Sequence, residues 1–192
     1  PPYGLRLAVM PILLVHYSLV RSERVALYRE GFFTPEWSDD VVDQLLQRPE
    51  AIEFRWVDGL SISSDLLTRV SDYVQGQFNT APSVTALDVT KPLVQFVLRL
   101  PPFVRRTSAI SARSKALRDV LINATDPYTL LFVEIPSALG FETGAERLSS
   151  DGEWGQLSER LSESVTELIN AEAKTLSSLK KSIFTALQAG EA

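Results

Sequence analysis

Residues 1–57 alternate between helical and extended patterns of apolar side chains. The apolar run from Leu7 to Val20, with Pro11 suited to a first helical turn, predicts a helix that ends near Arg21. This helix has almost no polar face, so we expect it to be buried inside the protein. At about 14 residues the run is shorter than the ~20 that a helix needs to span a bilayer.

Extended segments are predicted in the same part of the chain. Segments 25–28 and 32–34 flank a tight turn at 29–31, and together they predict a β-hairpin. The segment 38–49 predicts a helix that begins with a serine N-cap and ends at a proline. Alternating apolar residues over 52–56 predict a half-buried strand. A helix followed by a hairpin favours a winged-helix-like module for this first part.

The middle part, residues 58–148, has the pattern of a helical domain. Apolar spacing predicts a helix that is capped by Ser63 or Ser64 and carries apolar residues as far as Phe78. A second helix is predicted over roughly 88–100, with Pro92 tolerable in its first turn. A third helix begins at Ser111, a suitable N-cap, and a short helical turn follows it. The apolar pattern of residues 58–148 therefore predicts a helical bundle.

The last part, residues 149–192, is dominated by one candidate long helix. It begins at Gly152 or Trp154 and runs to Ala189, and some 35 residues at ~1.5 Å each would reach ~50 Å. Apolar positions recur every three or four residues in a narrow stripe, which is typical of a coiled-coil seam or of a strut across the domain. The stripe consists of Leu157, Leu161, Val165, Leu168, Ile169, Ala173, Leu176, Leu179, Ile183 and Leu187.

Together these patterns predict a fold that is mainly α with a small β element. The chain has 192 residues, of which 45% are hydrophobic, and a formal net charge of -5, values that exclude a disordered chain. It has no cysteine, which excludes disulfides, thiol nucleophiles and zinc–thiolate sites. The opening Pro1-Pro2-Tyr3 without an initiator Met favours a piece of a longer protein over a processed N-terminus. We expect a soluble cytoplasmic protein.

Positive charge is concentrated in the middle of the chain. Residues 58–125 carry a net charge of +3, whereas residues 126–192 carry -6, and no acidic residue lies between Asp88 and Asp119. Phosphate backbones attract such clusters by counterion release and by the arginine fork, so this segment is a candidate nucleic-acid interface. The candidate contacts are Arg99, Arg105, Arg106, Lys115 and Arg118, with Arg29 of the hairpin.

Two other interpretations of the basic segment stay open. It is also explained by a solvated face, or by a cationic patch that docks on the acidic last part. Within the helix after Ser111, we expect Lys115 and Arg118 to lie roughly opposite the leucine stripe and to face phosphate. Arg113 lies nearer the apolar side, so we expect it to pair with a carboxylate.

Groove reading and catalysis find little support in the sequence. In winged helices that read DNA, the helix before the wing enters the major groove, but the helix here offers Ile12 and Leu13 rather than donors and acceptors. His16 lies in the same apolar helix, where a core or cap role is expected. The run Asp39-Asp40 is explained better by a helix start than by a metal site. No phosphate-binding loop or nucleophile elbow is present, so we expect no catalytic residue, metal or cofactor.

Several short motifs stand out in the first part of the chain and between residues 100 and 140. They are Pro1-Pro2-Tyr3-Gly4-Leu5-Arg6, Val9–Leu14, Val25–Phe32, Leu100-Pro101-Pro102-Phe103, Ala116–Asp119, Ala124–Pro127 and Leu130–Gly140. The pattern resembles the region downstream of the P-loop core in large bacterial ATPases of phage-defence (BREX-like) and DNA-restriction loci, where a Pro-Pro-Tyr-Gly motif opens a winged-helix-like module. The resemblance covers residues 1–57 and 100–140 and leaves out the long helix.

The resemblance implies a role beside an ATPase core. The family's nucleotide-binding motifs have no matching positions in this chain, so ATP binding would belong to another part of a larger protein. Our first hypothesis is a non-catalytic module that couples the ATPase to partners, or to a second copy of itself, by protein–protein packing. The alternative is non-specific DNA binding through the basic segment 99–118. An independent enzyme such as a hydrolase is a third and weaker class.

Overall fold

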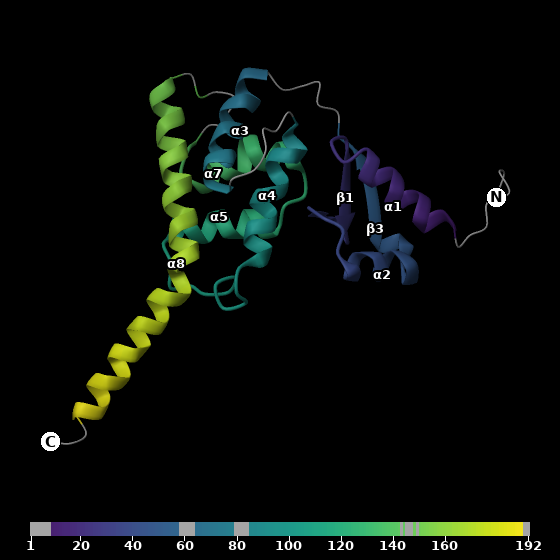
Figure 1. Cartoon of the computed structure of the whole chain (residues 1–192). Helices are drawn as coiled ribbons and strands as arrows, with labels where there is room; N and C mark the ends of the chain where they lie inside the picture. Colours follow the sequence, from purple (N-terminus) through teal and green to yellow (C-terminus); the bar gives the residue numbers. More distant parts are fainter. Residues whose placement is uncertain are drawn as a thin grey trace.

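The computed structural model describes residues 9–57, 64–78, 85–142, 144, 148 and 150–189. The fold is mainly α with a small three-stranded antiparallel sheet and a long C-terminal helix, as the sequence predicted. Figure 1 shows the long helix along one side of a helical domain and the sheet on the opposite side. The predicted domain limits at 57/58 and 148/149 border residues outside the described ranges.

The first part of the chain forms a small unit around the sheet. Its elements, in chain order, are α1 (Met10–Val20), β1 (Val25–Arg29), β2 (Phe32–Thr34), α2 (Asp39–Gln47), the 3-10 turn η2 (Pro49–Ala51) and β3 (Ile52–Trp56). The strands lie in the order β2-β1-β3, with Leu27 opposite both Thr34 and Phe54. The predicted helix, hairpin, second helix and third strand are all present, whereas kinship with winged helices stays a prediction.

The hairpin turn depends on two residues with positive φ. Glu30 has a φ of 52° and Gly31 a φ of 87°, which is the backbone of the tight two-residue turns that match the twist of paired strands. Glycine adopts this conformation without steric cost, whereas a side chain raises its energy. The Arg-Glu-Gly sequence therefore fixes both the turn and the register of β1 against β2.

Both faces of the central strand β1 are covered. One face carries Ala26 and Tyr28, which belong, with Phe33 of β2, to the main core of the helical domain. The other face carries Leu27, which packs in a second cluster with Val41, Leu45 and Ile52. The backbone N–H of Phe33 also donates to the Ala124 carbonyl at 2.7 Å. The sheet is thus the joint between the first unit and the helical domain.

The helical domain is built around one central helix. Its elements are α3 (Ser64–Phe78), α4 (Ala86–Arg99), α5 (Ala112–Ile122), α6 (Pro127–Thr129), the π-helical turn η4 (Leu130–Glu134) and α7 (Ile135–Ala138). Helix α4 begins two residues earlier than predicted, because Thr85 caps it by accepting from the Asp88 N–H. Pro92 therefore lies inside the helix and not in its first turn, which corrects the prediction. Buried leucines and valines of α4 lie at the centre of the main core.

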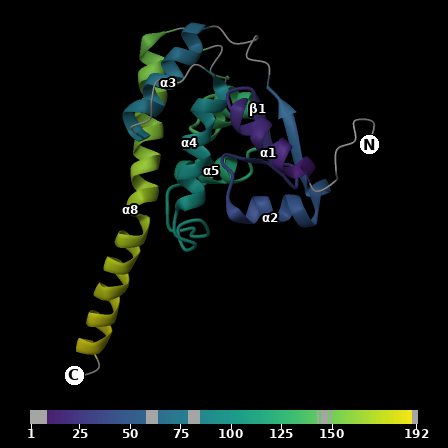
Figure 2. The same ribbon diagram turned by 45° about the vertical axis from the view of Figure 1, so that its right-hand side comes forward.

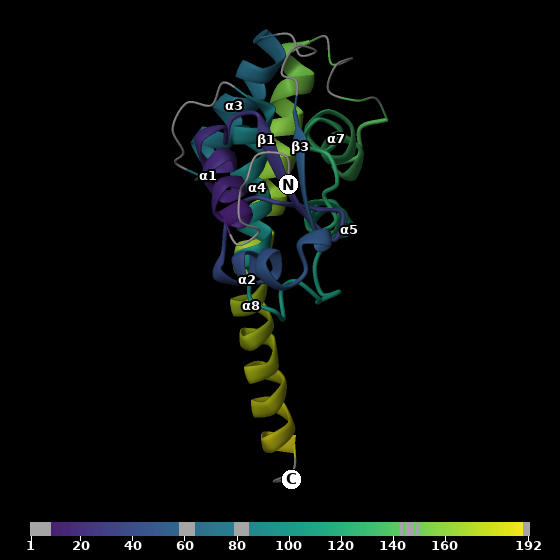
Figure 3. The same ribbon diagram turned by 90° about the vertical axis from the view of Figure 1, so that its right-hand side faces the viewer.

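The long helix α8 (Asp151–Ala189) has 39 residues and matches the prediction closely. Its first half packs on the domain through Leu157, Leu161, Val165, Leu168 and Ala171, all of them buried. From Glu172 to Thr185 every side chain is exposed or half-exposed. Figures 2 and 3 show this second half, hereafter the α8 overhang (residues 172–189), extending past the rest of the molecule toward the C-terminus.

The prediction that α1 is buried is wrong. Ser18 is the one buried residue of this helix, while Ile12 is 67% exposed and Leu19 55% exposed. The helix is attached through Val15, which packs on the second cluster, and through Ser18, whose hydroxyl accepts from the Trp37 indole N–H at 2.9 Å. Helix α1 is held by contacts on one side only. Because apolar side chains lie on all its sides, those on the other sides are exposed.

The hairpin turn generates a test of the fold. The Gly31→Ala change should destabilise the protein by about 1 kcal/mol or more, since alanine at positive φ is strained. The matched change Gly155→Ala should stabilise it by about 0.5–1 kcal/mol, because Gly155 lies in α8 with open space around it. Urea denaturation of both variants measures the two effects. Equal effects of the same sign would contradict this account of the turn.

Candidate functional site

The structure scatters the six cations of the predicted nucleic-acid interface over several elements. Arg29 ends β1, Arg99 ends α4, Arg105 and Arg106 lie in the turn after α4, and Lys115 and Arg118 belong to α5. Arg29 and Arg99 line one hollow of about 550 Å³ together with Glu30 and Glu36. The hollow is therefore mixed in charge and does not form a cationic surface.

Arg118 is buried, which corrects its assignment to a phosphate-facing surface. It is only 4% exposed, and its guanidinium donates to the carbonyls of Val104 and Thr107 at 3.2 and 2.6 Å. It also forms an ion pair with Asp119 at 2.9 Å. On the helix, position 118 borders the stripe of Leu117 and does not lie opposite it, so the arginine faces the loop before α5 and ties that loop to the helix.

Two other cations of the basic segment already have carboxylate partners. Arg99 pairs with Glu36 at 3.2 Å, which links α4 to the loop after β2. Arg113 pairs with Glu163 of α8 at 3.2 Å, as predicted for this residue. Both pairs are exposed, and exposed pairs contribute little stability. In both pairs, however, a carboxylate of the same chain neutralises the positive charge that a phosphate would need.

Four of the six predicted cations have no ion pair within the described part of the chain: Arg29 on β1, and Arg105, Arg106 and Lys115 in the basic segment. Arg106 and Lys115 are exposed, while the Nε atom of Arg105 is buried and lacks a hydrogen-bond partner. The exposed ring of Phe103 lies in the same turn. What is left of the candidate interface is therefore a small basic turn next to α8.

The junction of α5 and α8 is a polar clasp around Glu167. Its carboxylate accepts from the Ser111 N–H at 3.0 Å and from the hydroxyls of Ser111 and Ser114. Ser111 is also the N-cap of α5, since its hydroxyl accepts from the Ser114 N–H at 3.2 Å. Hydrogen bonds from Ser111 and Ser114 stabilise the charged carboxylate, so they lower the pKa of Glu167. The basic segment does dock on the acidic last part here, through two serines and Arg113.

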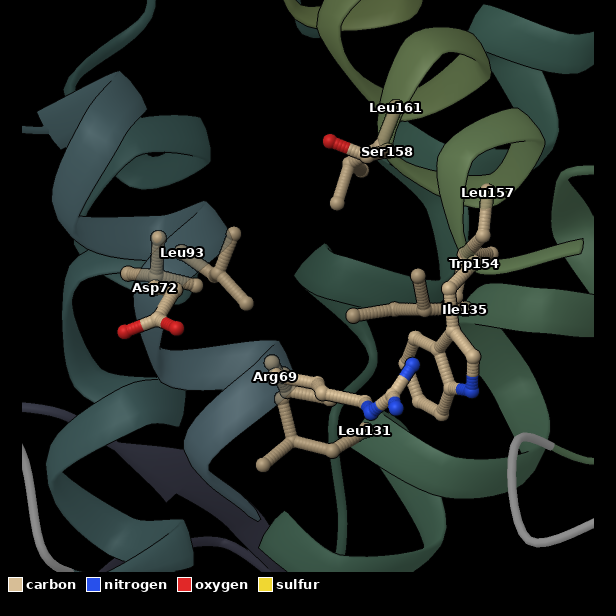
Figure 4. A pocket seen from close by; sticks show the side chains of 11 residues that line it. Arg69, Asp72, Leu93, Leu131, Ile135, Trp154, Leu157, Ser158 and Leu161 are labelled. Atoms are coloured by element: carbon tan, nitrogen blue, oxygen red, sulfur yellow. The ribbon is translucent and has the colours of Figure 1, made fainter. Parts of the chain in front are cut away.

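A second candidate site is an apolar cavity of about 410 Å³ between α3, α4, η4, α7 and α8. Figure 4 shows Asp72 on one side and Arg69 with Trp154 on another, around an apolar interior. Arg69 pairs with Asp151 at 2.6 Å and lies 6.0 Å from the centre of the Trp154 ring. The apolar lining consists of Val70, Val74, Leu93, Leu131, Ile135, Trp154, Leu157 and Leu161.

The size of this cavity is in the range of small-molecule sites, about 300–1,000 Å³. The cavity offers a ligand mainly apolar contacts. Its polar side chains are Ser158, Arg69 and Asp72, which lie at the margin. A serine needs an adjacent base to become a nucleophile, and among the residues that the structure describes no histidine or lysine lines the cavity. This cavity could not be predicted from the sequence, because its lining comes from helices that lie far apart along the chain.

The other residues that the sequence singled out do not converge. His16 lies exposed on α1, and Asp39 and Asp40 occupy the first turn of α2, as expected of a helix start. Glu134 is half-buried, and burial and the nearby Asp126 raise its pKa. In the described ranges no three His, Cys, Asp or Glu side chains converge to hold a metal ion. None of the helices in those ranges is long and apolar enough to cross a membrane.

The comparisons with known proteins give no relative. No family model, no curated protein and no solved structure matches the chain.

The Glu167 clasp predicts a specific pH dependence. Because the folded-state pKa lies below the ordinary value of 4.5, the clasp stabilises the fold fully above that value and is lost as pH falls through the folded pKa. Glu167→Gln should therefore lower the free energy of unfolding at neutral pH, and the gap to wild type should close in acid. Glu159→Gln, at an exposed carboxylate of α8, controls for the loss of charge. Denaturation curves in which the gap stays constant with pH would refute the clasp.

Proposed function

We propose that this chain is a non-catalytic module of a larger ATP-dependent protein of the phage-defence or DNA-restriction kind. In this proposal it works in the cytoplasm and couples the ATPase core to other parts by protein–protein packing. The resemblance of the N-terminal motifs supports the family, and the surface of α1 supports the packing role.

The observation that carries the proposal is the apolar surface of α1. Seven apolar side chains at the start of the first unit stand more than one third exposed: Val9, Met10, Ile12, Leu13, Tyr17, Leu19 and Val20. Each large aliphatic side chain gains about 1.5–3 kcal/mol when it is fully buried. Contiguous exposed apolar patches mark interaction sites in soluble proteins. We therefore assign α1 as the face that packs against the ATPase core.

The proposal predicts that charge on α1 abolishes docking. The double change Ile12→Asp/Leu19→Asp should weaken binding to the purified ATPase core about 100-fold or more, because two carboxylates would lose water in the interface. The change Leu46→Asp, at an exposed leucine of α2 in the same unit, is the matched control and should leave the affinity unchanged. Isothermal titration calorimetry measures each affinity. Equal affinity of wild type and the α1 variant would sink the proposal.

Non-specific DNA binding is the second candidate, and the unpaired basic turn favours it. If Arg105, Arg106 and Lys115 each neutralise one phosphate, affinity for a fluorescent duplex should fall about 40-fold between ~50 and ~200 mM salt. Reversing these three charges to glutamate should then abolish binding, whereas Arg48→Glu, just after α2, should not. Arg118 is left unchanged because it is buried. Binding by the triple variant at wild-type strength would exclude this site.

A further inference from the structure

The α8 overhang carries an apolar stripe that nothing in the described chain covers. Leu176 is 61% exposed, Leu179 53% and Ile183 58%, and Ile169 at the root of the overhang is equally exposed. Ile169, Leu176 and Ile183 are spaced by seven residues, so they form one row along the helix. At ~1.5 Å per residue the overhang is about 27 Å long, enough for several turns of helix packing.

We propose that the overhang pairs with the overhang of a second copy of this chain, antiparallel, about a two-fold axis at Leu176. This pairing goes beyond the proposed docking of α1, because it uses a different helix at the far side of the molecule. The argument for a second copy is that the stripe is complementary to itself in one register. A two-fold interface requires such self-complementarity, since the same patch serves on both subunits.

In this register, two residues that face each other lie at equal distances from Leu176 along the sequence, one before it and one after it. Leu176 meets Leu176 of the second copy, and Ile169 meets Ile183. The small Ala173 lies across from the large Leu179, which lets the two helices approach closely. The layers at these positions are therefore apolar.

Charge complementarity selects the same register. Glu172 of one copy lies across from Lys180 of the other, and the symmetry makes this pair twice. Moving the axis toward the C-terminus by about half a helical turn would bring Lys174 against Lys181 and Glu172 against Ile183. A parallel pairing in register would place Glu172 against Glu172. Both alternatives oppose like charges or bury an unpaired carboxylate, which costs free energy.

The root of the overhang supplies room for the tip of the second copy. A hollow of about 470 Å³ lies beside Ile169, between α3, α4 and α8, and its lining is apolar apart from Gln95 and Arg99. Phe78, Phe96 and Pro101 line it, and the rings of Phe78 and Phe96 lie 5.4 Å apart. Because Ile183 of the second copy reaches Ile169 in this register, its helix meets the mouth of the hollow there, and its last residues, 184–189, run past the hollow. The pairing thus covers the exposed stripe and borders this hollow at both ends.

The mass of the full chain in solution tests the pairing. Sedimentation equilibrium should give twice 21.3 kDa for wild type and 21.3 kDa for Leu176→Asp/Ile183→Asp. Ser178→Asp/Thr185→Asp adds the same charges on the other side of the overhang, and it should remain a dimer. Ile12→Asp/Leu19→Asp should also remain a dimer, which separates this inference from the docking of α1. A monomeric wild type, or dimers that only the α1 variant disrupts, would overturn the pairing.

The register has its own test, because the natural chain has no cysteine. Leu176→Cys should form a disulfide between two copies under mild oxidation, since this residue alone meets itself. Ser178→Cys, two residues away on another face, should cross-link at least ten times more slowly. Glu172→Lys should weaken the dimer, and Glu172→Lys/Lys180→Glu should restore it. Equal cross-linking of the two cysteine variants, or no recovery in the double variant, would contradict the register.

Discussion

The packing of the first half of α8 on α3 and α5 is the interaction on which the rest of the structure depends. Five buried apolar side chains from Leu157 to Ala171 close the main core, and Glu167 fixes the helix to the start of α5. Helix formation is cooperative, so a helix anchored at one end continues at low cost if its sequence has few breakers. The α8 overhang is the consequence of this anchor.

The sheet has the corresponding role on the other side of the molecule. Tyr28 and Phe33 enter the main core, while α2 covers the opposite face of β1 through Val41 and Leu45. Because both faces of β1 are already covered, the sheet has little free apolar surface on which α1 could pack. Its apolar side chains stay exposed and become available to another surface. The chain therefore presents exposed apolar side chains on two helices, α1 and the α8 overhang, at opposite sides of a well-packed body.

Much of this fold could be predicted from the sequence, because the patterns that decide it are local. The strand alternation at 52–56, the glycine of the hairpin turn and the serine cap of α5 each specify their element on their own. The burial of α1 could not be predicted correctly. A helix with apolar side chains on all sides is stabilised when it is buried. The sequence pattern does not show whether the surface that buries it belongs to the same chain.

The candidate site was harder to predict, because it depends on distant segments. The partners of Arg118 are carbonyls of Val104 and Thr107, which come from a loop with no recognisable pattern. Arg99 was expected to be available to phosphate, but it pairs with Glu36, which precedes it by 63 positions. The cavity beside Trp154 reflects the distance between whole helices. Side-chain chemistry at a helix start was predictable, whereas pairing across the fold was not.

Amide hydrogen exchange of α1 and of the α8 overhang tests the central claim most directly, which is that both apolar helices are covered in the working protein. The intact chain would be measured alone when dilute, alone when concentrated, and with the proposed partner, the ATPase core. The account predicts that concentration slows exchange in residues 172–185 and that the core slows it in residues 12–20. Exchange in both helices that is equally fast under all three conditions would contradict it.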